Sequence, residues 1–401
     1  MKIVVLSSLA FSLINFRGKL LEALRSAGHE VVAVAPDDDP DVRAELARIG
    51  IALRTVRMDR TGTNLLSDLS TIAAYVQLFR KERPDVVLAY TQKPIIYGGI
   101  ACRIVGIKRY YALMSGLGYL FSEAATDRRL LKVLFCRLYR AGLKSANKVF
   151  VFNSDDRADM IEAGILDRSS PILQVPGSGV DLDRFVKAEM PTGPVRFLMI
   201  GRLMRDKGVW EYAKAAAIVA EKHPNVEFAL IGRPELSNPT GLDAADLTEL
   251  KNEYPIEIID ETDDVPSFLR QAHAFVLPTY YREGLPRTIL EALAVGRAVI
   301  TTEAPGCRDA VTDGVNGFLV PPRNIESLAE AMMKMVEDRG MLVHMGNRSR
   351  ELAETVYDVK LVNRILMDEM KLSRECPMNG AQDSADTGRK LERPAIARGA
   401  A

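Results

Sequence analysis

Short segments that are almost wholly apolar alternate with amphipathic segments through the first half of the chain. The apolar segments include IVVLS, EVVAVAP, DVVLAY and KVFVFN, and the intervening RGKLLEALRSAG has helical hydrophobic spacing and a stop at Gly28. Strands that are apolar on both faces are typical of a parallel sheet covered by helices on both sides. We therefore expect residues 1–190 to form a doubly wound α/β, Rossmann-like domain.

The same alternation begins again after a linker at 191–194 that contains proline and glycine. A new strand is predicted from Val195 to Ile200, and VEFALIG, IEIID, AFVLPT, AVITT and GFLVPP follow it between helical patterns. We expect a second Rossmann-like domain over 195–372, with its last helix packing back on the first domain. Ligands of such sheets bind beyond the carboxyl ends of the strands, so two facing domains predict a binding cleft.

The two ends of the chain carry different signals. Residues 373–401 lose hydrophobic periodicity and are interpreted as a flexible tail. The N-terminal apolar run contains Ser7 and Asn15 and stops at Arg17, so it is too short to span a bilayer. We interpret it as a buried strand that starts at Ile3, and we expect no transmembrane segment.

The composition narrows the class of protein. The 401 residues include 53 Lys+Arg and 53 Asp+Glu, so the overall charge gives no indication of nucleic-acid binding. The four cysteines lie far apart and form no CxxC pair, which argues against a zinc site or a disulfide framework. Such cysteine usage fits a reducing compartment, and we expect a cytoplasmic location.

A candidate phosphate site follows the first strand of the second domain, in the segment MIGRLMRDKG. Gly201 ends the strand, Arg202 comes next, and Lys207 precedes a helix that opens near Val209. Glycine lets the backbone approach a ligand, and two cations near a helix N-terminus can bind phosphate. The alternative interpretation is a solvated loop with surface charges. Gly232 ends the next strand at the same edge.

A second candidate site lies in YYREGLPRTILEALAVG, where a strand turns into a helix. Pro286 suits the first helical turn because its missing N–H has no partner there. The amides of Gly284 and Leu285 would then point from the helix start toward an anion. Glu283, in the turn, is free to accept hydrogen bonds from sugar hydroxyls.

The helix that follows carries a second acid. Glu291 lies about a turn and a half into it, on the side of Thr288. The helix dipole favours acids at a helix start, which explains Glu283 but not Glu291.

Glu283 and Glu291, separated by seven residues in EGLPRTILEALAVG, resemble the signature of the retaining GT-B glycosyltransferases of family four. The segments PGSGVDLDRF, GRLMRDKG, ALIGRP, FVLPT and DGVNGFLVPP resemble other segments of that family in the same order, over most of residues 1–370. The resemblance implies the GT-B fold, two doubly wound parallel-sheet domains facing a cleft. It also implies that residues 1–190 bind the acceptor and residues 195–372 bind the nucleotide-sugar.

The resemblance also implies roles for the charged residues. Arg202 and Lys207 would hold the diphosphate of a nucleotide-sugar and stabilise the negative charge that grows on the leaving group. Glu283 would bind hydroxyls of the transferred sugar. Together these three form the implied catalytic set.

Further residues are implied to bind the donor. Glu291 would hold the ribose hydroxyls, while Gly232 and the segment around Val265 would pack against the base. The implied donor-binding positions are Gly201, Gly232, Val265, Gly284, Leu285, Pro286, Thr288 and Glu291. The nucleotide-sugar is a co-substrate, and no cofactor or metal is expected.

The segments GLGY and NFR resemble a bacterial subgroup of the family that builds cell-surface glycans on lipid-linked sugars. This implies transfer of a hexose or N-acetylhexosamine from a UDP-sugar to a lipid-linked saccharide. The basic amphipathic segment 127–148 can lie on an anionic membrane surface, or it can be an ordinary helix that packs on the sheet. A peripheral location on the inner face of the membrane is therefore expected.

Two departures from the family keep other interpretations open. Many members carry a glycine pair after the first strand and a histidine against the donor sugar, but here Ser115 or Gly116 takes the histidine position. A GT-B-like UDP-sugar 2-epimerase also needs histidine, so the scarcity of histidine counts against it. An inactive nucleotide-sugar-binding protein is the third possibility.

Two further polar segments are interpreted as structural. Asp37–Asp39 could bind a metal, as Asp-x-Asp does in the other glycosyltransferase fold, but a solvated acidic turn is the preferred interpretation. In VFNSDD we expect Ser154 to cap the helix that follows the strand.

Overall fold

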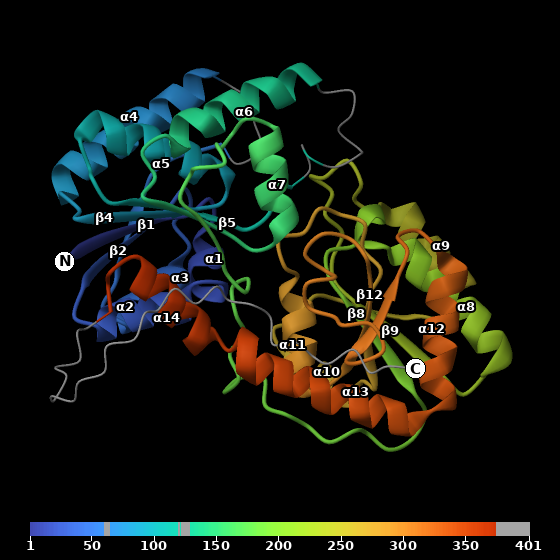
Figure 1. Cartoon of the computed structure of the whole chain (residues 1–401). Helices are drawn as coiled ribbons and strands as arrows, with labels where there is room; N and C mark the ends of the chain where they lie inside the picture. Colours follow the sequence, from blue (N-terminus) through green and yellow to red (C-terminus); the bar gives the residue numbers. More distant parts are fainter. Residues whose placement is uncertain (60–64, 119–120, 122–128, 374–401) are drawn as a thin grey trace, which may run out of the picture.

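The computed structural model describes residues 1–59, 65–118, 121 and 129–373. Within these residues the strands form two sheets, and every strand pair in both sheets is parallel. Helices flank each sheet, and the two α/β units lie side by side in Figure 1. Residues 374–401 of the predicted tail and residues 127–128 of the predicted basic segment lie outside the described residues.

The first sheet has the order expected of a doubly wound fold. Its strands, in spatial order, are β3 (Ala52–Thr55), β2 (Glu30–Ala35), β1 (Lys2–Leu6), β4 (Val86–Tyr90), β5 (Tyr110–Met114), β6 (Lys148–Val151) and β7 (Ile172–Gln174). The helices between them are α1 (Ala10–Asn15), α2 (Gly18–Ser26), α3 (Pro40–Arg48), α4 (Leu65–Glu82), α5 (Gln92–Val105), α6 (Arg129–Leu143) and α7 (Ser154–Glu162).

Burial on both faces explains why these strands are apolar throughout. Along β1, Ile3 and Val5 belong to one hydrophobic cluster, while Val4 and Leu6 belong to the other. Figure 1 shows α4, α5 and α6 on one side of this sheet and α2 and α3 on the other. Successive strand residues point to opposite faces, so both sides need apolar residues.

The second sheet repeats the order. Its strands are β10 (Glu257–Ile259), β9 (Glu227–Ile231), β8 (Arg196–Ile200), β11 (Ala274–Leu277), β12 (Ala298–Thr302) and β13 (Gly317–Val320). The 3₁₀ turn η3 (Arg205–Lys207) precedes the helices α8 (Val209–Lys222), α9 (Ala244–Glu253), α10 (Val265–Gln271), α11 (Arg287–Val295), α12 (Ile325–Glu337) and α13 (Arg339–Leu352). The predicted doubly wound α/β architecture of both halves is confirmed.

The C-terminal helix returns to the first sheet. After α13 the chain passes through a π-helical turn, η4 (Ala353–Tyr357), into α14 (Val359–Glu369), which packs against α2. At the crossing, the Val180 amide donates to the Tyr357 carbonyl at 2.8 Å, and the Val359 amide donates to the Val180 carbonyl at 3.0 Å. The segment around Val180, which leads to the second domain, and the segment around Tyr357–Val359, which returns to the first, are therefore hydrogen-bonded to each other.

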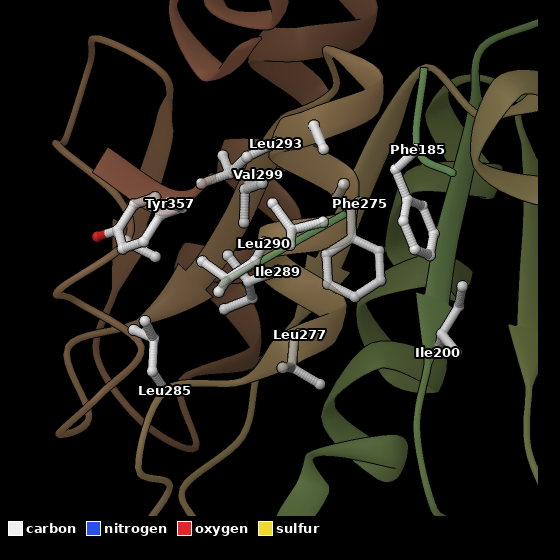
Figure 2. Close-up of a cluster of buried hydrophobic side chains, with 14 of the residues drawn as sticks. Phe185, Ile200, Phe275, Leu277, Leu285, Ile289, Leu290, Leu293, Val299 and Tyr357 are labelled. Carbon is white, nitrogen blue, oxygen red and sulfur yellow. The ribbon is translucent and has the colours of Figure 1, made fainter. Parts of the chain in front are cut away.

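Helix α11 is anchored by apolar side chains on three sides. Figure 2 shows Ile289, Leu290 and Leu293 among side chains of β11, β12 and the crossing segment. All three are 0% exposed, and each contributes about 1.5–3 kcal/mol by leaving water. The packing fixes the helix, and thereby the direction in which its N-terminal turn faces.

Candidate active site

The residues predicted to bind a donor lie at the carboxyl ends of four neighbouring strands. Gly201 follows β8, Gly232 follows β9, Val265 opens the helix after β10, and Glu283 follows β11. These strands are adjacent, in the order β10-β9-β8-β11. Parallel strands end at the same edge, so the sheet brings together residues that are up to 82 positions apart in the sequence.

The two glycines at this edge allow a close backbone contact. The Gly201 amide donates to the Ile231 carbonyl at 3.0 Å, which extends the β8–β9 ladder. A Cβ on Gly232 would lie only 1.9 Å from the Gly201 carbonyl oxygen. Any side chain at Gly232 would therefore push the two strand ends apart.

Lys207 and Glu283 meet at the centre of the edge. Their side chains form an ion pair between Nζ and Oε1, and they are 12% and 14% exposed. Gly208, at φ +81°, presses the loop onto β11, because a Cβ there would lie 2.3 Å from the Pro278 carbonyl oxygen. This left-handed glycine places Lys207 against the turn that carries Glu283.

Arg202 lies at the rim of the same edge. Its side chain is 48% exposed, and its Nη1 atom lies 3.5 Å from Glu235 Oε2. This guanidinium is the more accessible of the two predicted phosphate-binding cations. The loop therefore offers one shielded cation, Lys207, and one solvent-exposed cation, Arg202.

The Glu283–Leu285 turn differs from the prediction in one detail. Pro286 is not in the first helical turn: with ψ at 119° it is the N-cap residue, and α11 starts at Arg287. With this extended ψ, Pro286 is still outside the helix, as N-cap residues are. Gly284 packs against the first domain, since a Cβ there would lie 2.3 Å from the Ser115 carbonyl oxygen.

Glu291 is buried in α11, with 8% of its surface exposed. Burial raises the pKa of its carboxyl, and the charges of Arg287 and Arg184 oppose that shift. Arg287 Nε lies 3.0 Å from Glu291 Oε1, and Thr288 is half-buried on the same helix. The arginine partner is a site residue that the sequence analysis did not identify.

The first domain contributes Asn153, a residue that the sequence analysis also missed. Its Oδ1 accepts from the Asp156 amide at 2.7 Å and so caps α7, while Nδ2 donates to the Gly284 carbonyl at 2.7 Å. The prediction that Ser154 is the cap was wrong by one residue, because α7 begins at Ser154. Asparagine is among the preferred N-cap residues, so its place before the helix was the available signal.

A cluster of charges surrounds this interdomain contact. Arg282 of the second domain pairs with Asp159 of α7, and Arg308 Nη2 lies 2.5 Å from Asp155 Oδ1. Asp156 itself is 0% exposed, and burial raises the pKa of its carboxyl to about 7. Helix α7 and its N-cap residue are therefore joined to the donor side of the molecule by two hydrogen bonds from Asn153 and by two ion pairs.

The remaining polar candidates have structural partners. Asp37 accepts from the Ala10 amide at 2.9 Å, Asp38 pairs with Arg43 at 2.5 Å, and Asp39 caps α3. In the part of the chain that the structure describes, no group of three or more His, Cys, Asp or Glu side chains could hold a metal ion. The acidic turn is thus held by local contacts in this structure.

The histidine position of the family is occupied by backbone. Ser115 is exposed after β5, and the adjacent Gly116 approaches the Gly284 amide so closely that a Cβ would lie 2.9 Å from it. His29 contacts the Leu372 carbonyl at 2.7 Å, and His273 accepts from the Arg196 amide at 3.0 Å, both away from this edge. The contact between the domains here is made by glycine backbone.

The amphipathic segment forms α6, and part of its apolar stripe is exposed. Val133 and Leu134 are 45% and 44% exposed, whereas Phe135 and Leu138 are partly buried. Among the described residues, no helix combines the length and the apolar character that crossing a bilayer requires.

Comparisons with known proteins agree with this architecture. Residues 182–352 match the family described as Glycosyl transferases group 1, and residues 16–176 match the Glycosyl transferase 4-like domain. HepE of Anabaena, solved in complex with UDP, superposes with a TM-score of 0.74 at 19% identity over 92% of this chain and 100% of that one.

Curated relatives of similar length are glycosyltransferases. The N,N'-diacetylbacillosaminyl-diphospho-undecaprenol α-1,3-N-acetylgalactosaminyltransferase of Campylobacter jejuni is 24% identical over 90% of this chain and 96% of its own length. The UDP-Gal:α-D-GlcNAc-diphosphoundecaprenol α-1,3-galactosyltransferase of Escherichia coli is 26% identical over 75% of this chain and 79% of its own. These matches do not favour the epimerase or the inactive binding protein. The chain therefore belongs to the GT-B glycosyltransferases that combine a glycosyltransferase 4-like domain with a group 1 domain.

Proposed function

We propose that this glycosyltransferase is a retaining enzyme that transfers a hexose or N-acetylhexosamine from a UDP-sugar to a diphospho-lipid-linked saccharide, without a metal ion. The observation that carries the proposal is the convergence of Arg202, Lys207 and Glu283 at one strand edge, with Glu291 on the helix that follows the Glu283 turn. HepE, which shares the fold, has been solved with UDP and with UDP-glucose. The two relatives described above are named for diphospho-undecaprenol-linked acceptors.

The charges at the edge suit departure of a nucleoside diphosphate. As the bond between the anomeric carbon and the diphosphate oxygen breaks, its electron pair stays on the oxygen. Arg202 and Lys207 would stabilise this growing charge, which is the largest contribution that such a site makes. When the diphosphate binds, Lys207 would turn from Glu283 to the phosphate. The Glu283 carboxylate would then be free to accept hydrogen bonds from the sugar hydroxyls.

The new bond would form on the face that the diphosphate leaves. The acceptor hydroxyl attacks the anomeric carbon from that face, and its proton passes to the leaving diphosphate. This sequence retains the anomeric configuration and requires no protein nucleophile. Glu291 would hold the ribose hydroxyls, and Gly232 and Val265 would border the base.

Metal independence rests on the same two cations. Arg202 and Lys207 provide two positive charges where the diphosphate would lie, so the leaving group is neutralised by the protein itself. A chelator should therefore leave the rate of transfer unchanged.

A lipid-linked acceptor requires contact with a bilayer, and we assign that contact to α6. The exposed Val133 and Leu134 lie one helical turn from the exposed Arg137, a combination suited to an anionic surface. Replacing both with aspartate should reduce binding to anionic vesicles several-fold. Val343→Asp, at an exposed position on α13, serves as the control. Equal vesicle binding by both variants would show that α6 does not contact the membrane.

The test of the proposed reaction supplies the purified chain with a panel of UDP- and GDP-sugars and a polyprenyl-diphosphate-linked monosaccharide. Product mass identifies the donor, NMR gives the anomeric configuration of the new bond, and each reaction is repeated with a chelator. We expect one UDP-sugar to yield an α-linked disaccharide with or without the chelator. An inverted linkage, an epimerised donor, or a rate that depends on added metal would contradict the proposal.

A further inference from the structure

The first domain buries a cation that no carboxylate neutralises. Arg17 is 3% exposed and its Nε atom is buried without a hydrogen-bond partner, and among the described residues its guanidinium has no ion pair. Buried charges in proteins are normally paired, and buried donors are normally bonded. An uncompensated guanidinium in such a place therefore indicates a missing anion.

Arg17 lies at the edge of the first sheet that is near Arg287 of the second domain. Its guanidinium lies over the rings of Tyr90 and Phe152, 5.3 and 5.8 Å from their centroids. Tyr90 ends β4 and Phe152 follows β6, so both rings stand at the carboxyl edge of the first sheet. Ligands of doubly wound sheets bind at that edge. Phe152 is also followed directly by Asn153, which contacts the Glu283–Gly284 turn.

The groups around Arg17 add positive charge to the site and do not neutralise the guanidinium. Arg17 is the N-cap residue of α2, without a side-chain capping bond, and so lies at the positive end of the helix dipole. Arg287 of the second domain, whose positive charge acts on Arg17, contacts Asn15 and is paired with Glu291. Burial lowers the pKa of Arg17 to about 10, and the charge of Arg287 contributes to that shift. Arg17 nevertheless stays charged at neutral pH.

Stacking on two aromatic rings holds the guanidinium but does not neutralise it. Cation–π contacts engage the faces of the planar group and leave the N–H groups at its edge available. Those N–H groups match the geometry of phosphate oxygens, which they can bind in pairs. The two rings therefore hold Arg17 in a position to bind an anion, but they do not neutralise its charge.

We propose that Arg17 and the N-terminus of α2 form a diphosphate-binding subsite on the first domain, separate from Arg202 and Lys207 on the second. The inference rests on the proposed function for the source of the anion, which is either the lipid-linked acceptor or the donor. Phe16, next to Arg17 in the sequence, and Phe11, on the preceding helix α1, are 42% and 49% exposed. These apolar side chains favour the acceptor, whose diphosphate is attached to an apolar chain. A subsite here would hold the acceptor in the cleft while leaving its sugar free to reach the donor.

The subsite is tested first without any sugar transfer. Inorganic diphosphate is titrated calorimetrically into the full chain carrying Arg202→Ala and Lys207→Ala, which removes the second-domain cations. We expect saturable binding of one diphosphate, lost when Arg17→Gln is added. Absence of binding to the double variant, or binding that Arg17→Gln leaves unchanged, would overturn the proposal. If the Arg17→Gln protein does not fold, Arg17→Lys keeps the charge but loses the planar fork, and it should weaken binding at least three-fold; unchanged affinity there would equally overturn it.

Kinetics then identify the source of the diphosphate. With Arg17→Gln in the otherwise native chain, we expect the KM for the diphospho-linked acceptor to rise at least ten-fold. The KM for the UDP-sugar and the turnover of an alkyl glycoside acceptor without phosphate should stay unchanged. A rise confined to the UDP-sugar would support the subsite and assign it to the donor. The matched control is Arg48→Gln, on an exposed arginine of α3 paired with Glu45; identical kinetics for the two variants would overturn the proposal. Failure of every sugar transfer would refute the proposed function, while the diphosphate titration would still decide the subsite.

Discussion

At the scale of single residues, the site is a small set of charged side chains, most of them held in ion pairs. Lys207 and Glu283 hold each other at the strand edge, and Glu291 is buried beside Arg287. In each pair a ligand would take the place of one partner, the diphosphate at Lys207 and the ribose at Glu291. The structure therefore keeps the binding groups oriented before the donor arrives.

Removing Lys207 should affect the chemical step more than binding. We expect Lys207→Ala to lower kcat by roughly 10²–10³, because one of two cations that stabilise the leaving group is lost. Lys222→Ala, at an exposed position at the end of α8, is the matched control and should leave kcat unchanged. Steady-state kinetics on both variants provide the measurement. A near-native kcat for Lys207→Ala would show that Lys207 does not stabilise the leaving group.

Asp156 should make stability depend on pH. Its folded pKa, about 7, lies above the ordinary value of 3.8, so between these pH values the folded chain binds a proton that the unfolded chain has lost. Stability from this group is thus complete below about pH 4 and falls as the pH rises toward 7, by about 4 kcal/mol at most. Asp156→Asn removes the titration and should raise the melting temperature at pH 8 but not at pH 4. An equal change in melting temperature at both pH values would show that burial does not raise the pKa of this carboxyl.

At the scale of elements, the sequence predicted the strands better than the contacts between domains. The apolar runs and the repeated alternation were sufficient to place β8, β9 and β11, because burial on both faces leaves a strong pattern. The convergence of Gly201, Gly232 and Glu283 at one edge followed from that topology alone. Asn153 and Arg17 could not be recognised in the same way, since their significance depends on neighbours more than sixty residues away.

The bond from Asn153 Nδ2 to the Gly284 carbonyl should matter more for turnover than the cap that Asn153 Oδ1 provides for α7. Asn153→Asp keeps an oxygen that caps α7 but replaces the Nδ2 donor, so a buried carbonyl loses its partner. Such a loss costs about 1–3 kcal/mol, and we expect turnover to fall at least ten-fold. Asn324→Asp is the matched control, because Asn324 caps α12 by accepting from the Ser327 amide at 2.8 Å. If the two variants lose activity equally, the interdomain bond does not position Glu283.

At the scale of the whole molecule, the two domains are joined by the crossing near Val180 and by α14, as well as by the contact across the cleft. Val362, Leu366 and Met370 are each 0% exposed where the C-terminal helix packs back. The hydrophobic cluster that includes them also contains residues of both sheets, such as Val5 and Phe197. The C-terminal helix thus belongs to the same core as the first domain and the second.

Two truncations separate the tail from this helix. A chain that ends at Ser373 should keep its activity and melting temperature, since it retains all of α14. A chain that ends at Asp358 loses Val362, Leu366 and Met370 from the core, and we expect it to melt at least 10 °C lower or to aggregate. Thermal melts and transfer assays on both chains give the answer. Loss of activity in the longer chain would mean that the tail contributes to function.

The most direct test of the account is a crystal structure of the chain with UDP. We predict that the diphosphate lies within hydrogen-bonding distance of Arg202 and Lys207, with the ribose hydroxyls at Glu291 and the base between Gly232 and Val265. The Lys207–Glu283 pair should be open, with Glu283 facing the place of the transferred sugar. UDP bound elsewhere on the molecule, or held through a metal ion with Lys207 and Glu283 still paired, would contradict the account.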